Sequence, residues 1–283
     1  MPKLQQALFV VHNAKTTIMQ IKSVITAGLI LLFGCQNPTQ QKKSEPENPQ
    51  QEHFISFLTK SCDTYGNQSN DIQRREYFNQ FEKDIVKLSD SLGVFSNWKG
   101  KIKEIKTFDW SSQKSTELDV EIEIKLSDYQ EITLISKRFF SNKNIDSNLI
   151  YRQLKNLTTG STVYFDGFIA RDNDNKIDYD ILFSSDNRDK ICDPDMKFYI
   201  ISIGKEKLQF TTTEKFKKVN DIQMNIWQTM EDRVSKKITE TQFKNKLNDY
   251  KKQLDPIASS FTPEEKTYVQ SFTDCLASQF YAK

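Results

Sequence analysis

The chain of 283 residues is long enough for one or two domains, and its hydrophobic content of 37%, with 12% aromatic residues, is sufficient for a packed core. Its 40 basic and 38 acidic side chains give a formal net charge of only +2, so the charge balance provides no strong attraction to nucleic acid. Histidine occurs only at His12 and His53, which leaves the folded part without a base for a Ser–His or Cys–His nucleophile and without histidine ligands for zinc.

The amino-terminal residues carry the pattern of a secretory signal peptide. Residues 23–34 form the only long apolar run, and Lys22 precedes it. This run is shorter than the roughly 20 residues that a membrane-spanning helix needs. The segment that closes the run, Leu32-Phe33-Gly34-Cys35, resembles the lipobox of bacterial lipoproteins, although Phe33 is bulkier than that family prefers. The resemblance implies cleavage before Cys35 and attachment of lipid to this cysteine.

Cleavage would leave a lipid-anchored protein of the bacterial cell envelope, with Met19 as an alternative start of translation. Removing residues 1–34 takes away Lys3, Lys15 and Lys22, so the formal charge changes from +2 to −1. The residue after the lipidated cysteine is Gln36 rather than the aspartate that retains lipoproteins at the inner membrane, which favours a periplasm-facing anchor in the outer membrane. An uncleaved signal anchor or a buried helix is the alternative.

Two segments are expected between the cleavage site and the first strand. Residues 35–52 comprise the lipidated cysteine and a polar, proline-containing stretch that cannot bury enough apolar surface to fold, so we predict a disordered tether. Residues 53–96 show helical periodicity, with a break at residues 67–71 and a stop at Gly93.

Residues 97–204 change to the period of two that is typical of strands. Leu118, Val120, Ile122 and Ile124 alternate with charged residues and predict a half-buried strand. Further strands are predicted at residues 98–107, 131–137, 161–170, 178–184 and 196–203, with a short helix at residues 149–157. This order predicts an OB-fold, in which Ile122 and Phe165 should point inward.

Residues 205–283 return to helical periodicity. Thr262-Pro263-Glu264-Glu265 has the pattern of a capping box at the start of the last helix. The predicted fold class is therefore α+β, with a small OB-like antiparallel β-barrel flanked by N-terminal and C-terminal helices.

Four segments of the predicted barrel carry a resemblance to a known family. NWKGKIKEI, LDVEIEI, LIYRQLKNLTTGSTVYFDGFI and DPDMKFYIISI resemble the bacterial OB-like domains grouped as the tRNA-anticodon-like (tRNA_anti-like) family. The resemblance covers residues 97–203 and implies an ancestral nucleic-acid-binding fold without an assigned activity. The loop at residues 111–116 departs from the family because it lacks glycine.

Cysteine usage leaves the disulfide pattern open. After lipidation of Cys35, the remaining cysteines are Cys62, Cys192 and Cys275, an odd number that permits one disulfide and one free thiol. Cys62 and Cys275 lie in the two helical flanks, and we predict this pair first. Three buried free thiols are the alternative.

An acidic segment at residues 171–180 has a loose similarity to a calcium loop. Lys176 occupies the third ligand position and no glutamate closes the segment, so a solvated hairpin turn is the preferred interpretation and no metal site is predicted.

The predicted function is that of a non-enzymatic binding or interaction module that needs no cofactor. Its partners would be the membrane, through the lipid, and a protein or envelope ligand, but not nucleic acid. The candidate binding residues are Arg138, Phe139 and Phe140, because two consecutive rings in an extended chain cannot both face the core. The alternative is a carboxylate-dependent glycan hydrolase, which requires two acidic side chains about 5–10 Å apart in one cleft.

Overall fold

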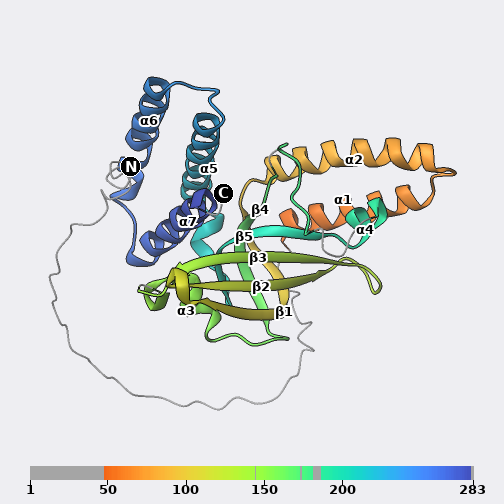
Figure 1. The fold of residues 1–283 in the computed structure, drawn as a ribbon, viewed down its shortest axis with the longest axis horizontal. Helices are drawn as coiled ribbons and strands as arrows, with labels where there is room; N and C mark the ends of the chain where they lie inside the picture. The colour runs from red at the N-terminus through yellow and green to blue at the C-terminus, as the bar shows by residue number, and fades with distance from the viewer. Residues whose placement is uncertain (1–47, 144, 173, 181–185, 282–283) are drawn as a thin grey trace, which may run out of the picture. The chain divides into compact units, whose positions relative to one another are not determined.

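The computed structural model describes residues 48–281 apart from residues 144, 173 and 181–185. It contains a closed five-stranded β-barrel with helices on both sides in the sequence and in space (Figure 1). The barrel and its helices belong to one compact unit, Pro46–Lys283. The predicted α+β class and the flanked, OB-like barrel are therefore confirmed. The predicted signal peptide and Cys35 lie outside the described residues.

The barrel is closed in the order β1-β2-β3-β5-β4. Its strands are β1 (Phe95–Trp110), β2 (Ser115–Lys125), β3 (Glu131–Ser141), β4 (Thr162–Ile169) and β5 (Asp195–Gly204). Short 3-10 turns are η1 (Ser111–Gln113), η2 (Ile145–Ser147) and η3 (Gln209–Thr212).

One strand pair differs from the predicted antiparallel barrel. Strands β3 and β5 pair in parallel over three positions, from Thr133 opposite Asp195 to Ile135 opposite Lys197. A closed ring with an odd number of strands cannot alternate direction at every neighbour, so one pair has to be parallel. Of the strand predicted at residues 178–184, the structure describes only residues 178–180, where an isolated bridge joins Tyr179 to Met196. Residues 181–184 lie outside the described residues.

Helices precede, interrupt and follow the barrel. The bounds are α1 (Pro49–Gly66), α2 (Asp71–Leu92), α3 (Leu149–Leu154), α4 (Asn187–Cys192), α5 (Glu214–Val234), α6 (Glu240–Ala258) and α7 (Pro263–Tyr281). The predicted break lies between α1 and α2, and Gly93 ends α2 with a positive φ of 60°. The predicted capping box is also present, since the Glu265 carboxylate accepts from Thr262 N at 2.8 Å. Among the described helices, none is sufficiently long and apolar to cross a bilayer.

The start of α1 corrects the predicted extent of the tether. The Asn48 side chain caps α1, and Pro49 occupies its first turn, where its missing N–H costs nothing. Gln50 and Gln51 then bind strand β1. Gln50 Oε1 accepts from Trp98 Nε1 at 2.9 Å, and the Gln51 amide bonds both the N–H and the carbonyl of Lys99, at 2.9 and 2.7 Å. Hydrogen bonds of the Asn48, Gln50 and Gln51 side chains therefore order the start of α1, although this stretch has no large apolar side chain to bury.

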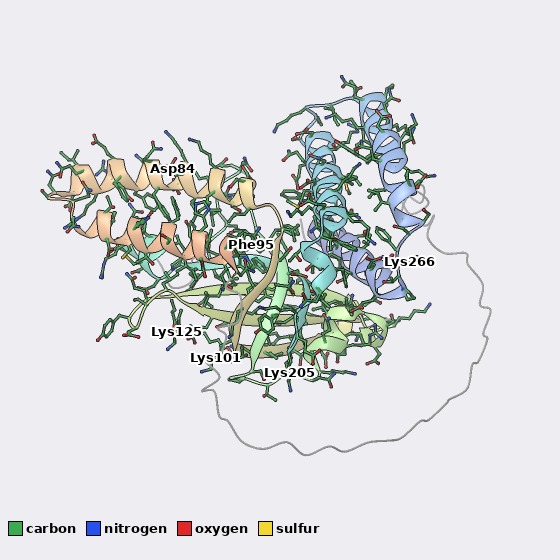
Figure 2. The ribbon with its side chains drawn as sticks, turned by 180° about the vertical axis from the view of Figure 1, so that it is seen from behind. Asp84, Phe95, Lys101, Lys125, Lys205 and Lys266 are labelled. Carbon is green, nitrogen blue, oxygen red and sulfur yellow. A yellow bond between two sulfur atoms is a disulfide. The ribbon has the colours of Figure 1, made fainter. Side chains whose placement is uncertain are left out.

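The amino-terminal helices extend the interior of the barrel. Phe95 (labelled in Figure 2) stacks on Trp98 with ring centroids 4.0 Å apart, and Phe54 of α1 packs against both rings. The inward positions predicted for Ile122 and Phe165 are confirmed by their burial at 0% and 1% exposure. Burial of this size supplies the main stabilisation of the unit.

The carboxy-terminal helices form a second core on the outer side of β4 and β5. Phe168 and Ile201 point away from the barrel interior and are buried against Phe216 of α5 and Phe272 of α7. Ile201 lies where the pairing of β4 with β5 shifts register, and Ser271 Oγ donates to its carbonyl at 2.6 Å. The hydroxyl therefore satisfies a buried carbonyl at an irregular point of the sheet.

The predicted Cys62–Cys275 disulfide is wrong. Cys62 of α1 is bonded to Cys192 of α4, with Cα atoms 4.9 Å apart, whereas Cys275 is buried and takes no part in a disulfide. The reason is positional, because α1 packs against α4 while Cys275 belongs to the separate core under α7.

Candidate functional site

The three predicted binding residues on β3 do not share one face of the sheet. Phe139 points outward and is 46% exposed, whereas Phe140 is 7% exposed on the inner face. Arg138 is also buried, its Nη1 donates to Ile200 O at 3.1 Å, and its guanidinium lies over the Phe140 ring. The structure therefore separates Phe139 from Arg138 and Phe140. Arg138 helps to close the barrel where β3 and β5 diverge.

Phe139 belongs to a different group of side chains on the outer face of β1, β2 and β3. It lies opposite Glu117 of β2, which in turn lies opposite Phe108 of β1, so the three residues form a row across the sheet. Trp110 is beside this row and its Nε1 donates to Glu117 Oε2 at 3.0 Å. We call Phe108, Trp110 and Phe139 the aromatic patch. Their exposed fractions are 48%, 44% and 46%.

Two members of the aromatic patch were missed by the sequence prediction, which ended the first strand at residue 107. The strand continues to Trp110 and pairs with β2 up to Ser115. The available signal was the alternation of Lys106, Phe108 and Trp110, which keeps the period of two beyond the predicted end.

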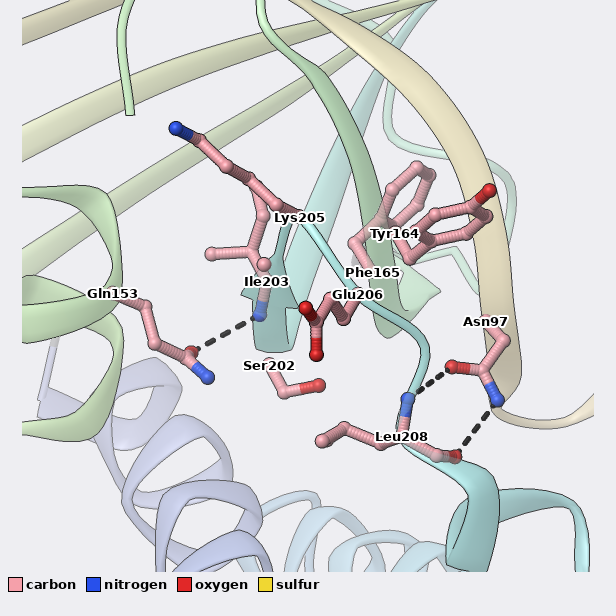
Figure 3. A pocket seen from close by; sticks show the side chains of 10 residues that line it. Asn97, Gln153, Tyr164, Phe165, Ser202, Ile203, Lys205, Glu206 and Leu208 are labelled. Carbon is pink, nitrogen blue, oxygen red and sulfur yellow. Dashed lines mark hydrogen bonds between the residues drawn. The ribbon is translucent and has the colours of Figure 1, made fainter. Parts of the chain in front are cut away.

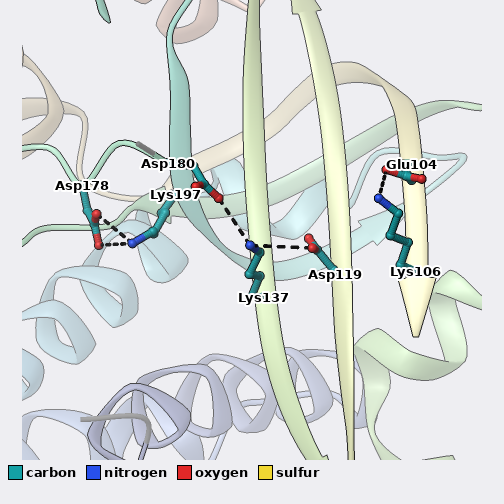
Figure 4. A network of polar contacts seen from close by, with 7 residues as sticks. All are labelled: Glu104, Lys106, Asp119, Lys137, Asp178, Asp180 and Lys197. Carbon is teal, nitrogen blue, oxygen red and sulfur yellow. Dashed lines mark hydrogen bonds and ion pairs between the residues drawn. The ribbon is translucent and has the colours of Figure 1, made fainter. Parts of the chain in front are cut away.

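Charged side chains occupy the rows next to the aromatic patch (Figure 4). Lys137 of β3 lies between two carboxylates, 3.8 Å from Asp119 and 3.3 Å from Asp180. On β1, Lys106 pairs with Glu104 within the same strand. The ammonium groups of Lys106 and Lys137, in the row beside Phe108 and Phe139, are therefore already paired with carboxylates.

Acidic side chains are in excess on this surface. Glu117 and Glu121 of β2 form no ion pair with a described residue, in contrast to Asp119 between them. Burial raises the pKa of Glu121, and the negative charge of Glu104 raises it further. Burial likewise raises the pKa of Asp119. An excess of carboxylates disfavours contact of this surface with polyanions.

A pocket of about 290 Å³ lies elsewhere, between α3, the ends of β4 and β5, and the segment that leads into η3 (Figure 3). Gln153 Oε1 accepts from Ile203 N at 3.1 Å on one side. On the other side, Asn97 holds Leu208 through two hydrogen bonds of 2.8 and 2.9 Å. These hydrogen bonds hold residues on both sides of the pocket against the strands of the barrel.

Asp166 is buried behind the Asn97 and Ser202 side of this pocket. It accepts hydrogen bonds from Asn97 N and, at 3.1 Å, from Ser202 Oγ. Loss of solvation raises the pKa of Asp166 to about 7, because these hydrogen bonds only partly compensate for burial. Among the described residues that line the pocket, Glu206 is the only one with a carboxylate, and glycoside hydrolysis needs two. The pocket therefore gives the hydrolase alternative no support.

The acidic segment at residues 171–180 forms a turn. Asp172 Oδ1 accepts from the backbone N–H groups of Asp174 and Lys176, at 2.9 and 2.8 Å, and Arg171 bridges to Ile177 across the turn. The Asp172 carboxylate is therefore engaged in hydrogen bonds to the backbone of the turn. In the described part of the chain, no group of three or more histidine, cysteine or acidic side chains is arranged to hold a metal ion.

No family model, curated protein or solved structure matches the chain.

Proposed function

We propose that this protein is a non-enzymatic binding module whose ligand site is the aromatic patch. The observation that carries the proposal is the clustering of three large rings, each almost half exposed, on one outer face of the barrel. Single exposed apolar residues are common on soluble proteins, whereas adjacent ones are typical of interaction sites. OB-folds also bind their ligands on the face of strands two and three, to which Phe139 and Glu117 belong.

The packing of the helices supports this assignment. Their principal contacts with the barrel involve β1 and β5. They leave Phe108, Trp110 and Phe139 almost half exposed. Aromatic side chains bind ligands with little loss of conformational entropy, because few torsion angles have to be fixed. The module would be held at a bacterial membrane by lipid on Cys35, as the lipobox-like residues 32–35 suggest.

Photo-crosslinking in producing cells tests the site even while the ligand is unidentified. A photoreactive phenylalanine at position 139 should form adducts, and Trp110→Ala in the same chain should reduce them. The matched control is the same replacement at Tyr129, which is 93% exposed in the β2–β3 turn and lies outside the aromatic patch. Equal adduct formation at positions 129 and 139 would contradict the proposal.

The membrane anchor is tested separately. Cys35→Ser should abolish labelling by palmitate and release the protein from the detergent phase. A Cys35→Ser chain that remains labelled would exclude lipid attachment at this residue.

A further inference from the structure

We infer that the partner of the aromatic patch is an extended polypeptide segment that carries lysine or arginine side chains. This inference rests on the proposed function and adds the chemistry of the ligand. It follows from the charges beside the rings and from the shape of the surface.

Charge complementarity is the first argument. The rows from the aromatic patch to Glu121 contain four carboxylates and only two ammonium groups, and Asp180 adds a further carboxylate at the edge. The four carboxylates are Glu104, Glu117, Asp119 and Glu121, and the two ammonium groups are Lys106 and Lys137. A cationic partner would relieve the repulsion among these carboxylates, whereas a phosphate-bearing polymer would increase it.

The geometry of the sheet is the second argument. The rows from Ser115 to Glu121 extend for about 20 Å along β2 at roughly 3.4 Å per residue, and three strands give a width of about 10 Å. An extended segment lying along β2 would place alternate side chains on this surface. Its aliphatic groups would contact Phe108, Trp110 and Phe139, while its cations would reach the rings and the carboxylate of Glu121.

A neutral oligosaccharide could stack on the same rings, but it would leave the carboxylates of Glu117 and Glu121 without an ion pair. Glu117 is engaged by Trp110 Nε1, and Glu121 is two rows away from the rings. A sugar on the aromatic patch would therefore make no use of the acidic end of the surface. A cationic peptide, in contrast, would contact both the aromatic patch and the carboxylate of Glu121.

The test measures binding of two fluorescent nine-residue peptides to the full chain at low ionic strength. In one peptide the odd positions, which share one face of an extended chain, are valine in one half and lysine in the other, and the even positions are serine. In the second peptide, glutamate replaces each lysine. We expect binding of the lysine peptide only, weakened on the order of tenfold by Trp110→Ala and lost as salt is raised. Tyr129→Ala serves as the matched control and should leave binding unchanged, because this ring lies outside the aromatic patch.

Two charge variants on the same surface should change the affinity for the lysine peptide in opposite directions. Glu121→Gln should weaken binding of the lysine peptide by about threefold, and Lys137→Gln should strengthen it by about the same factor. Chitohexaose and polyuridylate are titrated in parallel. Equal responses of the two charge variants, or Trp110-dependent binding of chitohexaose or polyuridylate in place of the peptide, would overturn the inference. Such results would leave the proposed function intact, because that proposal fails only if crosslinking at position 139 is not specific.

Discussion

The barrel has two outer faces that both carry aromatic side chains, and they have opposite environments. On β4 and β5, Phe168 points outward and is 2% exposed because Phe272 of α7 covers it, with ring centroids 5.8 Å apart. On β1 and β3, Phe108 and Phe139 also point outward, but each is nearly half exposed. The first face is part of the core, and the second is available to a partner.

The difference between the faces shows that an outward aromatic residue has no fixed meaning in a strand. Phe168 and Phe139 occupy equivalent positions in the alternation of their strands. What separates them is the path of the chain after β5, which returns over one face and leaves the other open (Figure 1). The following predictions test this contrast, from the largest expected effect to the smallest.

Phe272→Ala should have the largest effect, because it removes a fully buried ring from the covered face. Loss of a core phenylalanine typically lowers the free energy of unfolding by about 3–5 kcal/mol. Chemical denaturation followed by circular dichroism measures this change. A loss below about 1 kcal/mol would mean that α7 packs only loosely on β4 and β5.

Asp166 should make the covered face sensitive to pH. Its pKa is about 7 in the folded chain, against about 3.9 when unfolded, so the protonated form is favoured by folding. The contribution is fully present below about pH 4 and is lost as pH rises to about 7, with a total of about 4 kcal/mol. The advantage of the wild type over Asp166→Asn in unfolding free energy should therefore decline over this range.

Glu121→Gln is the control for this titration on the open face. The Glu121 carboxyl is only partly buried. Between about pH 4 and 7, the difference in unfolding free energy between the wild type and Glu121→Gln should therefore change much less than the difference for Asp166→Asn. A difference for Asp166→Asn that is independent of pH would contradict the predicted titration of Asp166.

Phe140→Ala and Phe139→Ala compare the inner and outer sides of one strand. Phe140 is buried against Arg138 and Tyr151, so its truncation should cost about 2–4 kcal/mol. Phe139→Ala should cost about 0.5 kcal/mol or less, as is usual at exposed positions, yet weaken binding of the lysine peptide. Thermal unfolding of the two variants measures the contrast. Equal destabilisation would show that Phe139 is part of the core.

Much of the fold follows from local patterns that can be recognised in the sequence. The alternation around Ile122 predicts β2 and its buried face, and the helical periods predict α2 and the carboxy-terminal helices. These predictions are accurate because burial of one face is a property of a short segment and needs no information about distant residues. The same holds for local caps such as Thr262 with Glu265.

The candidate site was only partly predictable. The sequence requires that Phe139 and Phe140 face opposite sides, but it does not say which of them is exposed. That choice depends on the register of β3 against β2, which places Phe139 opposite Glu117. Phe108 and Trp110 join Phe139 only because β1 pairs with β2 beyond the predicted end of the strand.

The sequence by itself determined most of the secondary structure and the α+β class, since these depend on composition and on local periodicity. Only the tertiary structure decided that Cys62 pairs with Cys192 and that Gln50 and Gln51 are ordered on β1. It also decided which outer face of the barrel is covered. Each of these features joins segments that are far apart in the chain, and contacts of that kind are set by how the helices pack on the barrel rather than by any local pattern.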